Sequence, residues 1–215
     1  MRISPDDILD CYRRGVFPMA DSRDDDRLYV CDPEERAIFP LGAFHVPRRL
    51  ARTVRADVFA IRVDTAFADV IAACAAPRAT SADTWINSEI RALYGALHTR
   101  GQAHSVEAWR GGALVGGLYG VALGAAFFGE SMFSTERDAS KVALVHLVAR
   151  LRVGGFRLLD AQFMTPHLAR FGAVSISRET FHTLLDDALA HDGEFFRLPA
   201  EISGAQALQS IAQTS

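Results

Sequence analysis

The segment between Arg110 and Glu130 places the strongest constraint on how this chain folds. It contains 19 consecutive uncharged residues, seven of which are glycine. A membrane-spanning helix of this length is usually built from larger apolar residues, whereas glycine within apolar strands marks turns and close backbone approach. The segment and its flanks therefore predict three consecutive strands over residues 104–133, with turns near 110–112 and 123–124.

Short helices and strands are expected on both sides of this glycine-rich region. A loop is expected over residues 77–84, and a short helix, a strand and a final helix after residue 165. The other elements are helices over 5–14, 45–55, 65–75, 84–101 and 134–153, and strands over 59–64 and 156–163. This order indicates an α+β fold in which helices pack on a mixed sheet.

The chain has 215 residues, enough for one large domain and a small appendage. Residues 1–36 are too few for an independent core, so we expect a small N-terminal domain there and the main domain over 37–215. The three cysteines, Cys11, Cys31 and Cys74, are too widely spaced for a disulfide framework or a zinc ribbon. The first residues lack the apolar core of a signal peptide, which favours the cytoplasm.

Charge is unevenly distributed. Residues 1–36 carry six basic and ten acidic side chains, whereas residues 37–62 carry five arginines against Asp57 alone. In the helix expected over 45–55, Leu50 and Val54 are four residues apart and face inward. The remaining faces carry Arg48, Arg49, Arg52 and Arg55. This pattern is compatible with a phosphate-binding helix and also with an ordinary solvated surface.

Three polar residues interrupt apolar strands. Asp160 and Gln162 are two residues apart, so strand alternation predicts that they share one face. Glu130 lies within Phe-Phe-Gly-Glu-Ser-Met-Phe, between aromatic side chains. Burying such groups costs free energy unless they are paired or functional. From these residues alone, all three can be catalytic, or the acids can bond to a loop or a turn.

No other familiar catalytic or cofactor-binding motif is found in the sequence. The Gly-Glu-Ser-Met-Phe segment lacks the final glycine of a hydrolase nucleophile elbow. There is no phosphate-binding P-loop, no dinucleotide fingerprint and no His-Glu-x-x-His pair. We therefore expect neither a metal nor a cofactor.

Eight sequence blocks between Leu9 and Phe181 resemble leucyl/phenylalanyl-tRNA–protein transferases. The most specific is Gly-Glu-Ser-Met-Phe-Ser (129–134), followed by Ala-Ser-Lys (139–141) and Asp-Ala-Gln (160–162). The segments 129–134 and 160–162 lie within the longer blocks 127–134 and 158–162. The other blocks are 15–19, 44–55, 84–86, 104–109 and 114–124. The resemblance implies a small N-terminal domain and a domain similar to the N-acetyltransferase fold.

The resemblance also implies a reaction. Members of this family move Leu or Phe, and less well Met, from charged tRNA to proteins with an N-terminal Arg or Lys, which marks them for degradation. The partners expected are therefore aminoacyl-tRNA and such proteins, without a membrane, and the chain is expected to act as a monomer.

Site residues follow from the matching positions. The resemblance implies that Asp160 and Gln162 orient or deprotonate the incoming amine, of which we favour orientation by Asp160, and that Glu130 organises the site. The arginines 48, 49, 52 and 55 correspond to the tRNA-binding cluster of the family. The substrate-binding positions are Met19, Trp85, Leu118, Phe127, Gly129, Ser131 and Leu159. Met19 departs from the family, since longer members have Trp there, and several apolar positions can instead be plain core.

Two other functions use the same features. An acyl-CoA-dependent N-acetyltransferase needs a glycine-containing pyrophosphate loop at a helix N-terminus, but residues 134–141 contain no glycine. A non-catalytic tRNA-binding protein would bind tRNA in a salt-dependent way without turnover.

Overall fold

The structure, a computed structural model, describes residues 3–25, 27–77 and 84–213. Most of the loop expected over 77–84 lies outside these residues. The helices are α1 (Pro5–Arg13), α2 (Arg48–Arg55), α3 (Phe67–Cys74), α4 (Ser88–Thr99), α5 (Ala139–Val153), α6 (Pro166–Ala169), α7 (Arg178–Leu189) and α8 (Gly204–Ala212), with a 3₁₀ turn η1 at Leu41–Ala43. The strands are β1 (Phe17–Met19), β2 (Tyr29–Cys31), β3 (Glu35–Phe39), β4 (Ala60–Val63), β5 (Ala103–Arg110), β6 (Ala113–Leu123), β7 (Ala126–Ser134), β8 (Leu158–Gln162) and β9 (Val174–Ser177).

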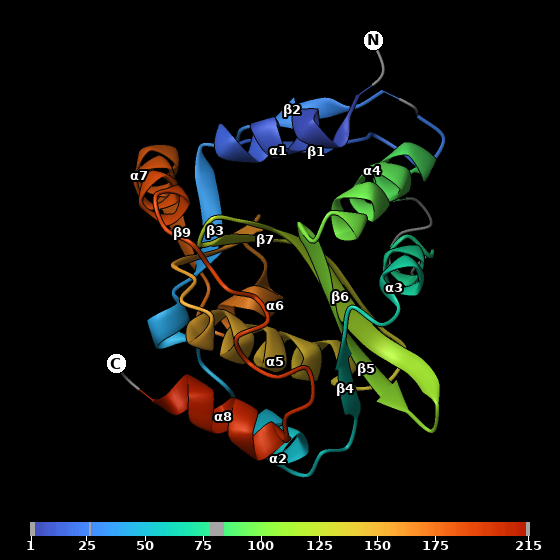
Figure 1. The fold of residues 1–215 in the computed structure, drawn as a ribbon, viewed down its shortest axis with the longest axis vertical. Coiled ribbons are helices and arrows are strands. Elements are labelled where there is room, and N and C mark those ends of the chain that lie inside the picture. Colours follow the sequence, from blue (N-terminus) through green and yellow to red (C-terminus); the bar gives the residue numbers. More distant parts are fainter. Residues whose placement is uncertain (1–2, 26, 78–83, 214–215) are drawn as a thin grey trace.

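A seven-stranded mixed sheet organises the main domain. Its strand order is β4-β5-β6-β7-β8-β3-β9, and β1 and β2 form a separate two-stranded sheet. The predicted three-strand meander is β5-β6-β7. Within the large sheet only β7 and β8 run parallel, because α5 carries the chain back across the sheet between them (Figure 1). The predicted α+β architecture with a mixed sheet is confirmed.

Two apolar clusters lie on opposite faces of the sheet. On one face, α3, α4 and α7 share a core with Ile8, Leu9 and Tyr12 of α1. On the other face, α2 and α5 pack over residues such as Phe127 and Leu159, and α8 packs on α5 (Figure 1). The N-terminal segment therefore has no core of its own, as its length predicted. β3 begins at Glu35 and belongs to the large sheet, while the domain boundary at residue 36 stays a prediction.

Capping residues define most helix starts. Ser4 and Asp7 form a reciprocal capping box on α1, and the Asn87 side chain caps α4 at the amide of Ile90. At α5, Asp138 makes no capping bond, and the Ser134 hydroxyl instead accepts from the Ser140 amide at 3.2 Å. Pro47 is the N-cap residue of α2 and makes no side-chain capping bond.

The sequence prediction misses the last helix. α8 begins at the capping residue Ser203 and packs on α5 and α2. A Cβ atom on Gly204 would lie 1.9 Å from the carbonyl oxygen of Val54, so only glycine allows α8 to approach α2 this closely. No helix among the described residues combines the length and the apolar character needed to cross a membrane.

Candidate active site

Strands β7 and β8 pair only near their beginnings. Ala126–Phe128 run parallel to Leu158–Asp160, and no β7–β8 pairing continues beyond them along the described strands. A Cβ atom on Gly129, the next residue of β7, would lie 3.3 Å from the carbonyl oxygen of Asp160. Glycine thus keeps the two backbones close where the strands part. A cavity of about 310 Å³ opens between them.

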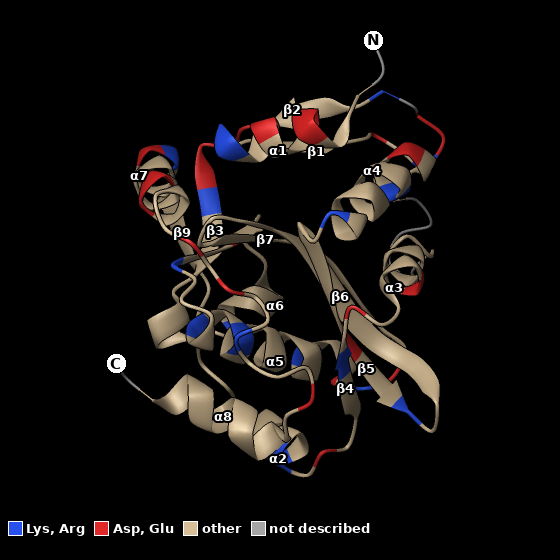
Figure 2. Ribbon diagram, viewed as in Figure 1, with Lys and Arg blue, Asp and Glu red and all other residues tan. Residues whose placement is uncertain are grey.

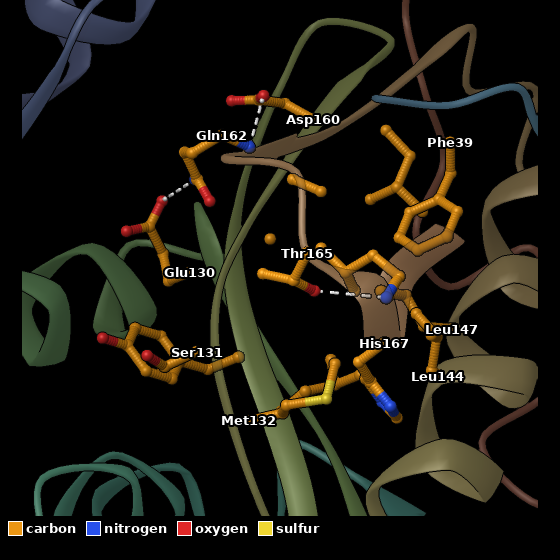
Figure 3. A pocket seen from close by; sticks show the side chains of 16 residues that line it. Phe39, Glu130, Ser131, Met132, Leu144, Leu147, Asp160, Gln162, Thr165 and His167 are labelled. Atoms are coloured by element: carbon orange, nitrogen blue, oxygen red, sulfur yellow. Dashed lines mark hydrogen bonds between the residues drawn. The ribbon is translucent and has the colours of Figure 1, made fainter. Parts of the chain in front are cut away.

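This cavity is mostly apolar, with polar groups along one side. Its apolar walls include Phe39, Leu118, Met132, Leu144, Leu147, Leu159 and Leu168. Gly129, Glu130, Ser131 and Gln162 border it as well. Figure 3 shows Glu130, Ser131 and Gln162 along one side of the cavity. An apolar cavity with a few polar groups holds an apolar ligand in one orientation.

Glu130 occupies a β-bulge. Tyr119 of β6 pairs with Ser131 and Gly120 pairs with Gly129, so Glu130 has no opposite residue on β6. A bulge of this kind redirects a side chain out of the regular strand alternation. The Tyr12 hydroxyl donates to Glu130 Oε1 at 2.6 Å and the Tyr94 hydroxyl to Oε2 at 3.2 Å. The two hydroxyl oxygens also contact each other, and because they carry only two protons between them, they cannot donate in all three contacts at once.

Burial raises the pKa of the Glu130 carboxyl to about 7, and the negative charge of Asp160 adds to this rise. The hydrogen bonds from Tyr12 and Tyr94 and the charge of Arg36 oppose it. Burial also raises the pKa of both tyrosines well above the usual value, so they remain protonated donors. Glu130 therefore exchanges its proton near neutral pH, as an acid–base group requires.

The carboxylate of Asp160 is held by Arg36. Nε and Nη2 of Arg36 donate to its two oxygens at 2.8 and 2.7 Å, and Asp160 is fully buried. The guanidinium lies between the rings of Phe17 and Phe181, 4.4 Å from each centroid, and donates to the carbonyl of Gly15. Asp160 borders the cavity, but its charged group is directed to Arg36. This geometry does not support the expectation that Asp160 itself attracts an incoming amine.

Asp160 controls the backbone of Gln162 instead. One Asp160 carboxylate oxygen accepts the Gln162 amide at 3.0 Å, and Gln162 has a left-handed φ of 54°. The pairing of β8 with β3 also skips Ala161. Regular strand alternation, on which the sequence prediction relied, therefore ends here. The turn directs the Gln162 side chain to Glu130, where Nε2 donates to Oε1 at 3.3 Å (Figure 3).

A second, smaller cavity of about 70 Å³ adjoins the first. It is lined by Met19, Trp85, Phe17 and Phe163, and it shares Glu130 and Gln162 with the larger cavity. Met19 and Trp85 thus border this smaller space rather than the large apolar one. Phe127 lines neither cavity, because its ring points into the core beneath α5 and stacks on Phe195.

The basic helix lies on the surface, as its pattern predicted. Leu50 and Val54 are buried, and all four arginines of α2 are exposed. Figure 2 colours the basic residues of the ribbon blue and the acidic residues red. Arg49 pairs with Asp138 at 2.8 Å. Within the described part of the chain, no acidic side chain forms an ion pair with Arg48, Arg52 or Arg55.

Sequence reasoning missed three residues of the site. Arg36 follows Glu34 and Glu35 in a polar stretch to which we assigned no function. Tyr12 and Tyr94 lie on the apolar faces of their helices, where an aromatic residue usually belongs to the core. The side-chain hydroxyl alone distinguishes these two inward-facing tyrosines from ordinary core residues, and this signal is weak.

Comparison with known proteins decides the family. Residues 38–186 match the family profile of leucyl/phenylalanyl-tRNA protein transferase, and residues 1–34 match the profile of its N-terminal domain. The chain belongs to this family. It is 61% identical over 210 residues to the leucyl/phenylalanyl-tRNA–protein transferase of Caulobacter vibrioides, covering 98% of this chain and 97% of the relative. Its identity to the Phenylobacterium zucineum transferase is 62% over 214 residues, 97% of each chain. The matched ranges therefore contain the residues that line the cavity between β7 and β8, and also Tyr12 of α1, which contacts Glu130.

Proposed function

We propose that this member of the family transfers Leu or Phe from charged tRNA to the α-amino group of proteins that begin with Arg or Lys, with Met as a weaker donor residue. The observation that carries the proposal is the junction of two cavities at Glu130 and Gln162. One cavity is apolar and large enough for a Leu or Phe side chain. The other provides a second approach to the same two polar groups.

The apolar cavity holds the transferred side chain in this proposal. Its walls of Leu and Met select by size and shape rather than by hydrogen bonds. One methylene in such a pocket changes binding by only about 1–3 kcal/mol, so selection between Leu and Phe is moderate. The ester then lies at the rim, beside Glu130 and Gln162.

The reaction exchanges an ester for an amide. The α-amine nitrogen attacks the ester carbonyl carbon, a C–N bond forms, and the C–O bond to the terminal ribose of the tRNA breaks. The proton lost by the amine passes to the departing ribose oxygen. An α-amine has a pKa near 7.7–8.0, so roughly a tenth of it is already neutral at pH 7, and positioning contributes more than a strong base.

The residues have separate tasks in this mechanism. Glu130, with its pKa of about 7, accepts a hydrogen bond from the amine and exchanges a proton with it. The Gln162 amide orients the amine or the ester. Asp160 and Arg36 act through Gln162 and do not contact the substrate, since their charges are paired in the interior.

The acceptor specificity has electrostatic support. Residues 1–36 carry ten acidic and six basic side chains, and part of this segment forms the smaller cavity. A negative surface attracts a chain terminus that carries both an α-ammonium group and a basic side chain. The product begins with Leu or Phe, which we expect to mark the acceptor for degradation.

A transfer assay tests this function. Labelled Leu-tRNA is incubated with peptides that begin with Arg, Lys or Asp and are otherwise identical. Transfer to the first two alone supports the proposal. Binding of tRNA without transfer would favour a non-catalytic protein, and labelling from acetyl-CoA would favour an N-acetyltransferase.

A further inference from the structure

A third cavity lies next to the apolar one. It has a volume of about 340 Å³ and shares His167 with the apolar cavity. We call it the basic cavity and define it by Arg49, Arg137, Lys141, Arg170 and His167 around Asp138. It lies between α2, the loop before α5, the first turn of α5 and the end of α6.

The basic cavity has a strong excess of positive charge. Four cationic side chains face one carboxylate, that of Asp138. Asp138 is nearly buried and accepts from Lys141 Nζ at 2.6 Å and from Arg49 Nη2 at 2.8 Å. It thus fixes these two cations in the wall. In the described part of the chain, Arg170 forms no ion pair with a carboxylate.

The positive charge of the basic cavity favours binding of an anion that has a low pKa and several oxygen atoms. Arginine donates to phosphate oxygens in a planar fork, and lysine adds a point charge. His167 is neutral at physiological pH, since burial and the charges of Lys141 and Arg170 lower its pKa. Its ring therefore offers one N–H donor without adding a further charge.

We propose that the basic cavity binds one backbone phosphate of the tRNA 3′ end, the phosphodiester that joins the terminal adenosine to the preceding nucleotide. This inference rests on the proposed function, because the aminoacyl ester must occupy the neighbouring apolar cavity. The shared wall at His167 sets the two ligand groups side by side. The exposed arginines of α2, which include Arg49, then continue the basic surface toward the rest of the acceptor stem.

The basic cavity and the exposed outer face of α2 have different roles in binding tRNA. Contacts by Arg48, Arg52 and Arg55 are open to solvent and hold the tRNA at a distance from the ester. A phosphate bound by Arg137, Lys141 and Arg170 instead fixes the nucleotide that carries the amino acid. Phosphate contacts of this kind position a nucleic acid without reading its sequence.

Substrates with and without the phosphate test the proposal. Three donors carry the same labelled leucine: Leu-tRNA, the dinucleotide ester leucyl-CpA, which has the phosphodiester, and leucyl-adenosine, which has none. Each is assayed at constant ionic strength with the wild-type chain, Arg137→Gln and Arg170→Gln. Both side chains are exposed, and Lys141 is left intact because it holds Asp138. Arg157→Gln, which changes an exposed arginine outside the cavity, is the matched control.

We expect each cavity variant to raise KM for leucyl-CpA and Leu-tRNA roughly 10-fold, the usual effect of one hydrogen bond to a charged group. KM for leucyl-adenosine and kcat for all three donors should stay at the wild-type values, as should every constant of Arg157→Gln. Equal losses with leucyl-adenosine, or no loss with any donor, overturn the phosphate site while the transfer function stands. A wild-type chain that transfers leucine from none of the three overturns both.

Discussion

Arg36 and Asp160 are 124 residues apart in the sequence, and their side chains form two hydrogen bonds of 2.8 and 2.7 Å in the interior. Through this pair the N-terminal segment, which supplies the Gly15 carbonyl and the Phe17 ring around Arg36, is connected to the strand that carries Gln162. The geometry of the cavity junction therefore depends on how the N-terminal segment packs.

Removing Arg36 should strongly destabilise the fold. Arg36→Met leaves the Asp160 carboxylate buried without a counter-charge, which typically costs about 3–5 kcal/mol. Urea unfolding followed by circular dichroism measures this difference. Arg157→Gln breaks the exposed pair with Asp187 and should change stability by less than about 1 kcal/mol. Equal stability of Arg36→Met and the wild type would show that the pair is not buried in solution.

The double variant Arg36→Met/Asp160→Leu separates stability from positioning. An apolar pair of similar volume often replaces a buried ion pair with little loss, so the double variant should be more stable than Arg36→Met. It should still transfer leucine poorly, because the Gln162 amide loses the oxygen that fixes its turn. A stable double variant with full activity would remove Asp160 from the mechanism.

The left-handed conformation of Gln162 allows its backbone and its side chain to be tested separately. Glycine adopts a φ of 54° without a steric penalty, so Gln162→Gly should be at least as stable as the wild type in thermal unfolding. It lacks the amide that orients the reactants, and kcat should fall roughly 100-fold while KM for tRNA stays the same. Gln162→Ala, which keeps the Cβ atom, should show the same kinetic loss. Wild-type kcat in both variants would assign the residue a structural role only.

Glu130 should make transfer and stability depend on pH. Its pKa in the fold is about 7, against 4.5 for a free side chain. Between these values the folded chain holds a proton that the unfolded chain releases, so stability falls as the pH rises through this window. Transfer should rise with pH through about 7, because the ionised form accepts the proton, and again as the acceptor amine titrates near 7.7–8.0.

Glu130→Gln is the matched variant for this pH dependence. It keeps the shape of the side chain and removes its titration. Its rate profile, measured as kcat/KM from pH 5.5 to 9, should retain only the rise of the amine, and its stability should lose the fall between pH 4.5 and 7. If the rate profile of Glu130→Gln still showed both rises, the rise at the lower pH would belong to another group.

The elements that the sequence predicted correctly are those whose pattern is formed by residues close together in the chain. Leu50 and Val54 on α2, the helix α4 within residues 84–101 and the three strands around the glycine-rich segment depend on neighbours a few residues away. The blocks that resemble the transferase family contain both Glu130 and Gln162, whose side chains are hydrogen-bonded to each other in the structure.

The parts that were missed depend on contacts between distant segments. Nothing near Arg36 indicates that it lies between two aromatic rings, one of which comes from α7. The bulge at Glu130 and the left-handed turn at Gln162 interrupt strand alternation, so a period of two misplaces their side chains. Met19 was assigned to the pocket for the amino acid from its matching position in the family, and no sequence pattern shows that it borders the smaller of two adjoining cavities.

The size of the apolar cavity should set the preference between Leu and Phe. Leu144 of α5 is buried in its wall, and Leu144→Phe adds an aromatic ring to that wall. We expect kcat/KM for Phe-tRNA to fall about 10-fold more than that for Leu-tRNA, within the range of size discrimination in apolar pockets. Leu144→Met, of nearly equal volume, should keep the wild-type ratio. An unchanged ratio in Leu144→Phe would place the transferred side chain elsewhere.

The salt dependence of tRNA use should report how many phosphates α2 contacts. Replacing Arg48, Arg52 and Arg55 by Gln removes three exposed cations that form no ion pair with the described carboxylates, so the fold should keep its stability. If each contacts one phosphate, KM for Leu-tRNA rises, and the slope of log KM against log salt decreases by about 0.7–0.9 per lost contact. KM for leucyl-adenosine, which lacks phosphate, should not change. A triple variant with the wild-type slope would show that these arginines are an ordinary solvated surface, the alternative that their spacing alone leaves open.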